Sequence, residues 1–349
     1  MKILSEILMF FERSRDAKKE NTHIKQGNIL IKAGLTLFTA GIILNITFSI
    51  QSNIQFSFII NSSIGWFVSI LGAILILVGI IIIILGLSNE KKEWRLKKFY
   101  YLKGIDNQMP DPPIHALPKM AIWYHESPIL LSIGNQSLNN TFDDLKFSMK
   151  MIEDKVEQYQ SKGVFFAGIA RIPCLFFIGY SFRNAHSKIS LLEHEHQSDK
   201  WVMLEQVDAF DINLKIDSNI KNETKEITDI AITIEFTSEI LKQELPLHLQ
   251  SNLIRIKSTR NYSHNLITSQ RTLHRIIEDI INELIKLNKK CNRLHLFISA
   301  QISVIFELGR RYQDGMIGNI TIYNYDAIKK GYPWAISLTD NKIKLERFE

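Results

Sequence analysis

The pattern of hydrophobic and polar positions divides the chain into two parts. The runs 33–50 and 64–87 carry no charged residue, and each is long enough to cross about 30 Å of hydrocarbon as a helix. After residue 118, short apolar runs alternate with polar segments, as in a soluble domain. The pattern therefore predicts a two-helix transmembrane hairpin, with helices over 33–50 and 64–87, followed by a soluble domain.

The soluble part alternates between strand-like and helix-like patterns. Apolar residues spaced three and four apart between 145 and 159 predict an amphipathic helix. Aliphatic and aromatic runs predict strands at "KMAIWYHES" (119–127), 163–171, 189–195, 230–236, 253–258, 294–300 and 320–325. Further helices are predicted over 173–184, 273–284 and 302–313. Strands that alternate with helices favour a mostly parallel sheet with helices on its faces, so the predicted fold class is α/β.

One unit of this pattern occurs twice. "GVFFAGIARIPCLFFIGYSF" (163–182) and "LHLFISAQISVIFELGRRYQ" (294–313) share the pattern A-x-I-x-x-x-F-x-x-G. In both copies an amphipathic helix precedes the unit and an aliphatic strand follows it. The repetition predicts two related Rossmann-like halves in tandem. The small residues of the pattern are expected to permit tight strand–helix packing; they are Ala170, Gly179, Ala300 and Gly309.

Charge is concentrated beside the apolar runs. Residues 1–32 hold seven Lys or Arg against four Asp or Glu, residues 90–103 hold six against two, and residues 51–63 hold none. Basic flanks remain in the cytoplasm, so both termini are expected inside and only a short loop outside. The segment 1–32 is predicted to be a cytosolic N-terminal segment.

The boundary of the soluble domain is predicted within 88–117. "NEKKEWRLKKFYYLKG" (89–104) is basic and aromatic, as expected of a collar at the membrane interface. "MPDPPIHALP" (109–118) has four prolines in ten residues and cannot form a helix. The segment 88–117 is therefore predicted to be a basic collar and proline-rich linker, and the soluble domain is predicted to occupy 118–349.

The net charge of +6 is a property of the membrane flanks. Those flanks contribute +3 and +4, which leaves residues 104–349 with a net charge of −1. A nearly neutral soluble part argues against binding along DNA or RNA polymers, because such binding neutralises many phosphates. It leaves room for a small ligand with two to four phosphates. The two cysteines, Cys174 and Cys291, have no metal-like spacing and fit a reduced cytosol.

Glycines recur every seven residues in the apolar runs. The second run contains the register Gly65, Gly72, Gly79 and Gly86, and the first contains Gly34 and Gly41 at the same period. Small residues on one face allow another helix to approach closely in lipid. The register predicts a packing face, either within the hairpin or between subunits.

The candidate ligand-binding residues lie where the repeated strands turn into helices. In an open α/β sheet these carboxyl ends form the ligand crevice, and helix starts at Pro173 and Ser303 would present free N–H groups there. Two such ends are expected to face one composite pocket. The polar neighbours predicted to line it are Tyr124, His125, Arg171, Thr237, Ser238, Ser299 and Gln301.

Signals for catalysis are scarce. The chain has no phosphate-binding loop, nucleophile elbow, zinc-protease motif or dinucleotide fingerprint. "EHEH" (193–196) places two histidines on one strand face, but no third metal ligand follows at a suitable spacing. No metal and no cofactor is therefore predicted, and the protein is not expected to be an enzyme.

The doubled unit, together with "NITIYNYD" (319–326) and "GYPWAISL" (331–338), resembles the SAVED domain of effectors in bacterial CBASS anti-phage defence. The resemblance covers about 118–349 and implies two CARF-like halves that bind a cyclic di- or trinucleotide made by a partner nucleotidyltransferase. Two membrane spans occupy the effector position here, as in the transmembrane SAVED effectors. The chain departs from the usual sequence pattern of that family at Arg171, where small or apolar residues are commoner.

The combined hypothesis is a ligand-gated effector in the inner membrane. Cyclic oligonucleotide binding is expected to drive association through SAVED domains, so that the hairpins gather, disrupt the lipid bilayer and cause abortive infection. Two alternatives remain open. The chain could be a membrane-tethered enzyme that degrades cyclic nucleotides, or a receptor that recruits another effector.

Overall fold

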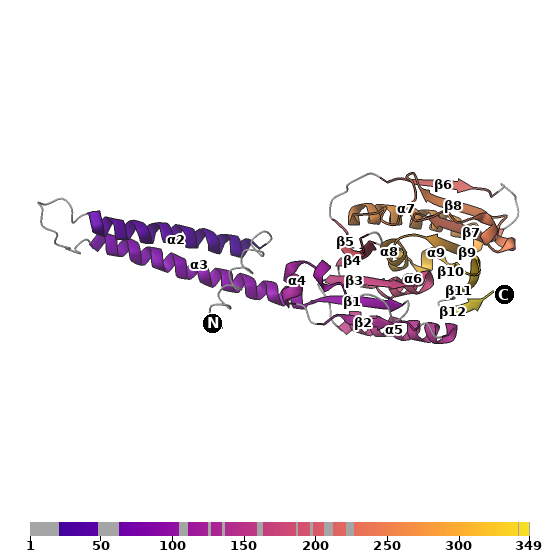
Figure 1. Cartoon of the computed structure of the whole chain (residues 1–349), viewed down its shortest axis with the longest axis horizontal. Coiled ribbons are helices and arrows are strands. Elements are labelled where there is room, and N and C mark those ends of the chain that lie inside the picture. Colours follow the sequence, from indigo (N-terminus) through magenta and orange to yellow (C-terminus); the bar gives the residue numbers. More distant parts are fainter. Residues whose placement is uncertain are drawn as a thin grey trace, which may run out of the picture. The chain divides into compact units, whose positions relative to one another are not determined.

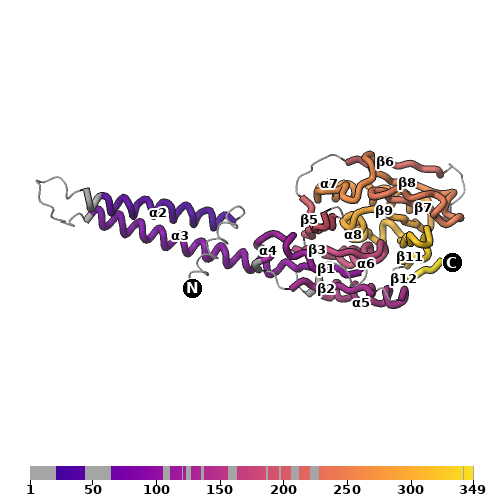
Figure 2. Tube along the Cα trace, viewed as in Figure 1, coloured from indigo at the N-terminus to yellow at the C-terminus, as the bar shows by residue number. Residues whose placement is uncertain are grey.

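The computed structural model describes residues 21–47, 63–104, 111–124, 127–134, 137–158, 163–185, 188–195, 198–205, 212–220, 227–340 and 342–348. The chain divides into two compact units, one of residues 1–95 with 118–126 and one of residues 96–117 with 127–349 (Figure 2). The predictions for residues 1–20 and for the loop 51–62 lie outside the described residues.

The first unit is a hairpin of two long helices that lie side by side (Figure 1). They are α2 (Thr22–Thr47) and α3 (Ser63–Arg95). α3 extends beyond its predicted span 64–87 at both ends, whereas α2 begins well before its predicted span 33–50 and ends within it, at Thr47. Stretches of both helices are long and apolar enough to cross a membrane. Lys92 and Arg95 occupy the last turn of α3, where positive charge interacts favourably with the helix dipole.

Glycines lie along the whole contact between α2 and α3. A Cβ atom added at Gly34 would lie 2.7 Å from the carbonyl oxygen of Gly72, and one added at Gly72 would lie 2.7 Å from the oxygen of Gly34. Gly27 faces Gly79 and Gly41 faces Gly65 in the same way, while Gly86 approaches the side chains of His23 and Ile24. Of the two packing partners left open by the sequence, the structure therefore shows the one within the hairpin.

The second unit contains two sheets with helices packed on them. The first sheet has the order β2-β1-β3-β4-β5, in which β1 to β4 are parallel and β5 is antiparallel. Its elements are β1 (Lys97–Gly104), β2 (Ile129–Ser132), α5 (Leu138–Gln158), β3 (Gly163–Ala170), α6 (Ile172–Ser181), β4 (Lys188–Glu195) and β5 (Lys200–Met203).

The second sheet has the order β12-β11-β10-β9-β7-β8-β6, with β8, β7, β9 and β10 parallel at its centre. Its strands are β6 (Leu214–Ser218), β7 (Ile227–Glu235), β8 (Leu253–Ser258), β9 (Cys291–Ser299), β10 (Asn319–Asp326), β11 (Gly331–Thr339) and β12 (Lys342–Arg347). Its helices are α7 (Gln270–Asn288), α8 (Ile302–Arg311) and α9 (Asp314–Ile317), and the 3₁₀ turns η2 (Lys242–Glu244) and η3 (Leu247–Leu249) follow β7. The mostly parallel α/β architecture is as predicted.

The predicted boundary of the soluble domain is wrong, because β1 lies inside the segment assigned to the collar and linker. β1 pairs in parallel with both β2 and β3, and residues 99–102 are buried on both faces of the sheet. The aromatic residues expected at a membrane interface therefore fill the core of the sheet. A fragment that begins at residue 104 or 118 would lack an interior strand.

The segment predicted as the first soluble strand is also different. After the 3₁₀ turn η1 (Ile114–Ala116), "KMAIWY" forms the helix α4 (Lys119–Tyr124), which belongs to the first unit. The first strand of the first sheet in chain order is instead β1, which lies between β2 and β3.

The two copies of the repeat meet through α6 and α8. A Cβ at Gly179 would overlap the carbonyl oxygen of Phe306, and a Cβ at Gly309 would overlap the oxygen of Phe176. Phe306 also stacks on Phe166 of β3, with ring centroids 4.2 Å apart. The glycine and the phenylalanine of each repeat thus form a reciprocal contact with the other repeat, which joins the two halves into one core.

The second sheet buries a different set of residues on each face. Alternate isoleucines of β7 (Ile230, Ile232, Ile234) face the main core, which both halves share. The opposite face carries a smaller cluster in which Phe297 and Tyr323 stack with ring centroids 4.2 Å apart. Ile240, Leu245 and Leu249, from the segment between β7 and β8, belong to this second cluster and cover it.

We expect that Gly179→Ala and Gly309→Ala each destabilise the protein by about 1–3 kcal/mol or more, because an added methyl group forces the two helices apart. Urea unfolding of the full chain in detergent measures the effect. Gly315→Ala is the control, because a Cβ there meets no atom within 4 Å. Equal stability of all three variants would contradict the reciprocal contact.

Candidate ligand-binding site

Three hydroxyl groups converge at the carboxyl edge of the second sheet, where β7 and β9 end side by side. The Oγ of Ser299 lies 2.7 Å from Thr237 Oγ1 and 2.7 Å from Ser238 Oγ, and it accepts a hydrogen bond of 3.1 Å from the Ser238 backbone N–H. Ser238 is exposed, and the other two are partly exposed. The structure therefore brings together three of the predicted site residues.

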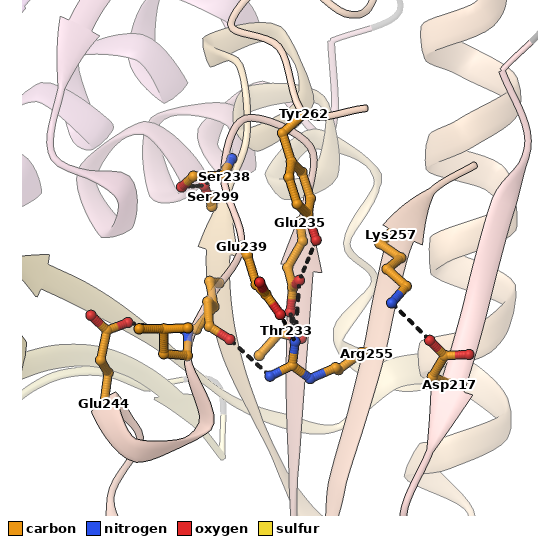
Figure 3. Close-up of polar contacts among 12 residues, drawn as sticks. Asp217, Thr233, Glu235, Ser238, Glu239, Glu244, Arg255, Lys257, Tyr262 and Ser299 are labelled. Carbon is orange, nitrogen blue, oxygen red and sulfur yellow. Dashed lines mark hydrogen bonds and ion pairs between the residues drawn. The ribbon is translucent and has the colours of Figure 1, made fainter. Parts of the chain in front are cut away.

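A charged network lies beside this hydroxyl cluster (Figure 3). The buried carboxylate of Glu235, at the end of β7, lies 3.3 Å from the guanidinium of Arg255 and accepts hydrogen bonds from Thr233 (2.6 Å) and Tyr262 (3.1 Å). Arg255 also lies 3.2 Å from Glu239. Burial, together with the neighbouring Glu235, raises the pKa of Tyr262 to about 12, so Tyr262 remains a hydroxyl donor.

The network fixes the segment that follows β7. Arg255 donates a 2.9 Å hydrogen bond to the carbonyl of Ile240, which anchors the covering segment to β8. Burying an ionised carboxylate is costly unless it is paired and hydrogen-bonded, and Glu235 is both. The sequence did contain a signal for this network, because Glu235 and Arg255 each follow isoleucine-rich stretches of strands that are largely aliphatic.

The start of α8 is occupied by a side chain from the other half. The carboxylate of Glu193, on β4, accepts a 2.6 Å hydrogen bond from the backbone N–H of Ser303. Burial raises the pKa of the Glu193 carboxyl to about 7, against hydrogen bonds from the first turn of α8 that lower it. The anion that the N-terminus of α8 was predicted to bind is therefore an internal carboxylate.

Gln301 is also committed to the fold. Its Oε1 accepts a 2.6 Å hydrogen bond from the Ile267 N–H, and its Nε2 donates a 3.0 Å bond to the Ile267 carbonyl. A Gln301→Ala change would leave two buried backbone groups of Ile267 without these partners, which costs stability. It is therefore unsuitable as a probe of ligand binding.

The start of α6 has different neighbours. Arg171 precedes the helix, and its guanidinium lies over the ring of Trp334 on β11, 5.9 Å from the ring centroid. Pro173 is buried in the first turn, where its fixed φ angle suits a helix start. The prediction that the starts of α6 and α8 converge on one pocket is therefore wrong: Arg171 meets β11, whereas Ser303 meets β4.

The remaining predicted residues are placed as follows. Tyr124 ends α4 in the first unit, and His125 lies outside the described residues. In the EHEH segment, His194 Nε2 lies 3.0 Å from Asp199. Among the described residues, no group of three or more His, Cys, Asp or Glu side chains could hold a metal ion.

The constellation most like a catalytic one lies in the sheet interior. His295 Nδ1 lies 2.9 Å from the Tyr323 hydroxyl, and Nε2 lies 2.9 Å from Asp229. Burial lowers the pKa of His295, although Asp229 raises it, so the imidazole is neutral near pH 7. His295 and Tyr323 are both buried, which leaves them out of reach of a substrate.

The hydroxyl cluster offers hydrogen-bonding groups at the edge of the sheet. Hydroxyl and N–H groups hydrogen-bond phosphate and ribose oxygens, but a nucleophilic hydroxyl also needs a general base beside it. The two carboxylates of the adjoining network, Glu235 and Glu239, are paired with Arg255. The arrangement fits recognition of a polar, phosphate-bearing ligand.

The sequence of residues 149–338 matches the family described as "SMODS-associated and fused to various effectors sensor domain", abbreviated SAVED. The match extends over more than half of the chain. This chain therefore belongs to the SAVED family. No curated protein matches it.

Solved structures of similar proteins include Cap4 SAVED/CARF-domain containing receptors. The receptor of Acinetobacter baumannii with the cyclic trinucleotide 2′3′3′-cAAA is 14% identical, with a TM-score of 0.48 over 77% of this chain and 59% of that one. The same receptor with 3′3′3′-cAAA is 15% identical with the same TM-score and coverage. The Moraxella osloensis receptor is 16% identical, with a TM-score of 0.44 over 72% of this chain and 50% of that one. The chain thus spans at most about three fifths of these receptors.

We predict that Glu193→Gln changes the pH dependence of stability. The folded-state pKa of about 7 lies above the ordinary value of 4.5, so the folded state binds more protons between these values and wild-type stability falls as pH rises through this window. The glutamine variant, which keeps an acceptor oxygen, should lack this fall and gain stability relative to wild type up to about pH 7.

Urea unfolding of both full chains between pH 5 and about pH 8 tests this prediction. Glu195→Gln, on the same strand but only half-buried, is the control. A constant difference between the Glu193→Gln variant and wild type at every pH would contradict the buried, proton-binding carboxyl.

Proposed function

We propose that this protein is a membrane-anchored sensor whose SAVED domain binds a cyclic oligonucleotide. The observation that carries the proposal is the fusion, in one chain, of a SAVED domain and a hairpin of two helices that are apolar enough to cross a membrane. The solved Cap4 receptors, which are described with cyclic trinucleotides, suggest the chemical class of the ligand. A partner nucleotidyltransferase would supply it.

In this proposal the hydroxyl cluster at the ends of β7 and β9 contacts the ligand. Thr237, Ser238 and Ser299 offer hydroxyl groups and a loop that is tied to β9 by the Thr237 and Ser238 backbone N–H groups. Arg171 is a second candidate contact, because it is partly exposed and carries the charge that phosphate prefers. Gln301, Pro173 and Ser303 support the fold instead.

The output of the sensor is proposed to be membrane damage. Ligand binding favours association of SAVED domains by the difference in ligand affinity between the assembled and free states. Assembly gathers the hairpins in the inner membrane, with both termini in the cytoplasm as the basic flanks indicate. Disruption of that membrane would end the infected cell before phage release.

An enzyme that degrades cyclic nucleotides is the competing function. Mass analysis of 3′3′3′-cAAA after long incubation with the full chain separates the two functions. The sensor leaves the nucleotide intact, and an enzyme converts it to linear products.

We predict that Ser299→Ala weakens binding of the cognate cyclic nucleotide by about tenfold to a hundredfold, since a lost hydrogen bond to a charged group costs about 1.5–3 kcal/mol. Calorimetry on the full chain in detergent, with a panel of cyclic di- and trinucleotides, measures the affinity. Ser251→Ala is the control, because this exposed serine precedes β8 at the opposite edge of the sheet. Equal affinity of the two variants would place the ligand elsewhere.

A further inference from the structure

The glycine contacts fix the register of the hairpin. Gly34 faces Gly72, so Lys32, two residues before Gly34, lies level with Ile74, two residues after Gly72. By the same register Thr36 lies level with Ile70, and Lys25 with Ile81. Near the cytosolic end, Asn21 Nδ2 donates a 3.2 Å hydrogen bond to the Gly86 carbonyl, which agrees with this alignment.

This register places lysines beside the most apolar part of α3. Ile74 lies within the uncharged run 64–87, about 15 Å along the helix from Ile64 and about 20 Å from Leu87. If this run crosses the bilayer, Lys32 lies within the hydrocarbon region. A lysine facing lipid at that depth costs roughly 2.5–3.5 kcal/mol in helix insertion, and such residues normally face water or a partner.

The lysines belong to a polar stripe on the outer face of α2. Lys25, Lys32, Thr36 and Thr39 are all exposed, and they recur at helical spacing on the side opposite the glycines. Thr36 and Thr39 donate to the carbonyls of Lys32 (3.0 Å) and Leu35 (2.9 Å), so their hydroxyls are compatible with lipid. The ammonium groups of Lys25 and Lys32 are not compatible with lipid. The helix α2 contains no acidic residue that could neutralise them.

The outer face of α3 is different. Its exposed side chains within the uncharged run are apolar; the larger ones are Trp66, Phe67, Ile70, Ile74, Leu77, Ile81, Ile84 and Leu85. The exposed face of α2 also carries apolar side chains, namely Ile29, Leu35, Phe38, Ile42 and Ile43. It is therefore mixed, and only its two lysines require hydration, whereas the exposed face of α3 suits lipid throughout. Sliding the hairpin outward until Lys32 reached the cytosolic surface would instead expose Leu77, Ile81 and Ile84 to water.

We propose that the stripe of Lys25, Lys32, Thr36 and Thr39 faces the same stripe on further copies of this chain and lines a water-filled path for anions. The inference rests on the proposed gathering of hairpins in the membrane. Copies that turn their α2 faces inward hydrate the lysines while their α3 faces meet lipid. Rings of lysine attract anions and repel cations, as in anion-selective pores.

Thiol accessibility in the full chain tests this path. Thr36→Cys probes the stripe, and Ile70→Cys is the control at the same depth on the lipid-facing side of α3. Each variant is reconstituted in vesicles of phosphatidylethanolamine and phosphatidylglycerol at several protein densities, with and without 3′3′3′-cAAA. Membrane-impermeant thiol reagents of either charge are then applied, and the labelling of Cys174 and Cys291 in the unsubstituted chain is subtracted.

Because a thiol must ionise in water to react, Thr36→Cys should be labelled at least about tenfold faster than Ile70→Cys. The anionic reagent should react faster than the cationic one, and an added Lys32→Gln change should reduce that preference. Slow labelling of both cysteines under every condition overturns the water-filled path. Fast labelling of both overturns it as well, together with the proposed membrane span, and the absence of an anionic preference overturns the anion path.

Discussion

The soluble unit depends on a backbone contact that only glycine permits. Gly179 and Gly309 each lie against the phenylalanine carbonyl of the other repeat, so α6 and α8 approach more closely than any side chain would allow. This approach joins the two halves in one continuous core and brings Phe306 onto Phe166. It also holds β4 of the first half beside the start of α8, where Glu193 binds the Ser303 N–H.

The hairpin also depends on close backbone contacts at glycines, but for a different physical reason. In the proposed membrane location, lipid would offer no hydrophobic driving force for two apolar helices to associate, so close packing would have to supply the attraction. Reciprocal glycine contacts such as Gly34 with Gly72 provide it, and they leave the outer faces of both helices free. The outer face of α2 carries Lys25 and Lys32 among apolar side chains, whereas that of α3 has no charge within the run 64–87, and this difference is the basis for the proposed assembly around α2.

Much of the fold could be predicted because the strands and helices follow local patterns of hydrophobic residues. The strand 253–258 and the halves of the repeat follow from periodicity and from one constant spacing. The strand β1 could not, because "KKFYYLKG" has the composition of a membrane interface, and its burial depends on pairing with β3, which lies far along the chain. "KMAIWY" has no helical period long enough to separate a helix from a strand.

The candidate site was predicted less completely, since its contacts are formed between distant residues. Ser299, Thr237 and Ser238 were expected near one another because each follows the end of a strand, and the structure shows them in contact. The partners of Gln301 and Ser303, namely Ile267 and Glu193, lie 34 and 110 residues away and left no local trace. The sequence repeat was taken to mean that the starts of α6 and α8 share one pocket, but a repeated sequence does not require this.

The central claim is that a nucleotide bound to the SAVED domain acts on the membrane through the hairpin. The most direct measurement is release of a trapped dye from vesicles that contain the full chain, on addition of a cyclic nucleotide that calorimetry shows to bind. The account predicts release that requires both the nucleotide and the hairpin and that is lost when Ser299→Ala abolishes binding at the concentration used. Tight binding without any release of dye would contradict it.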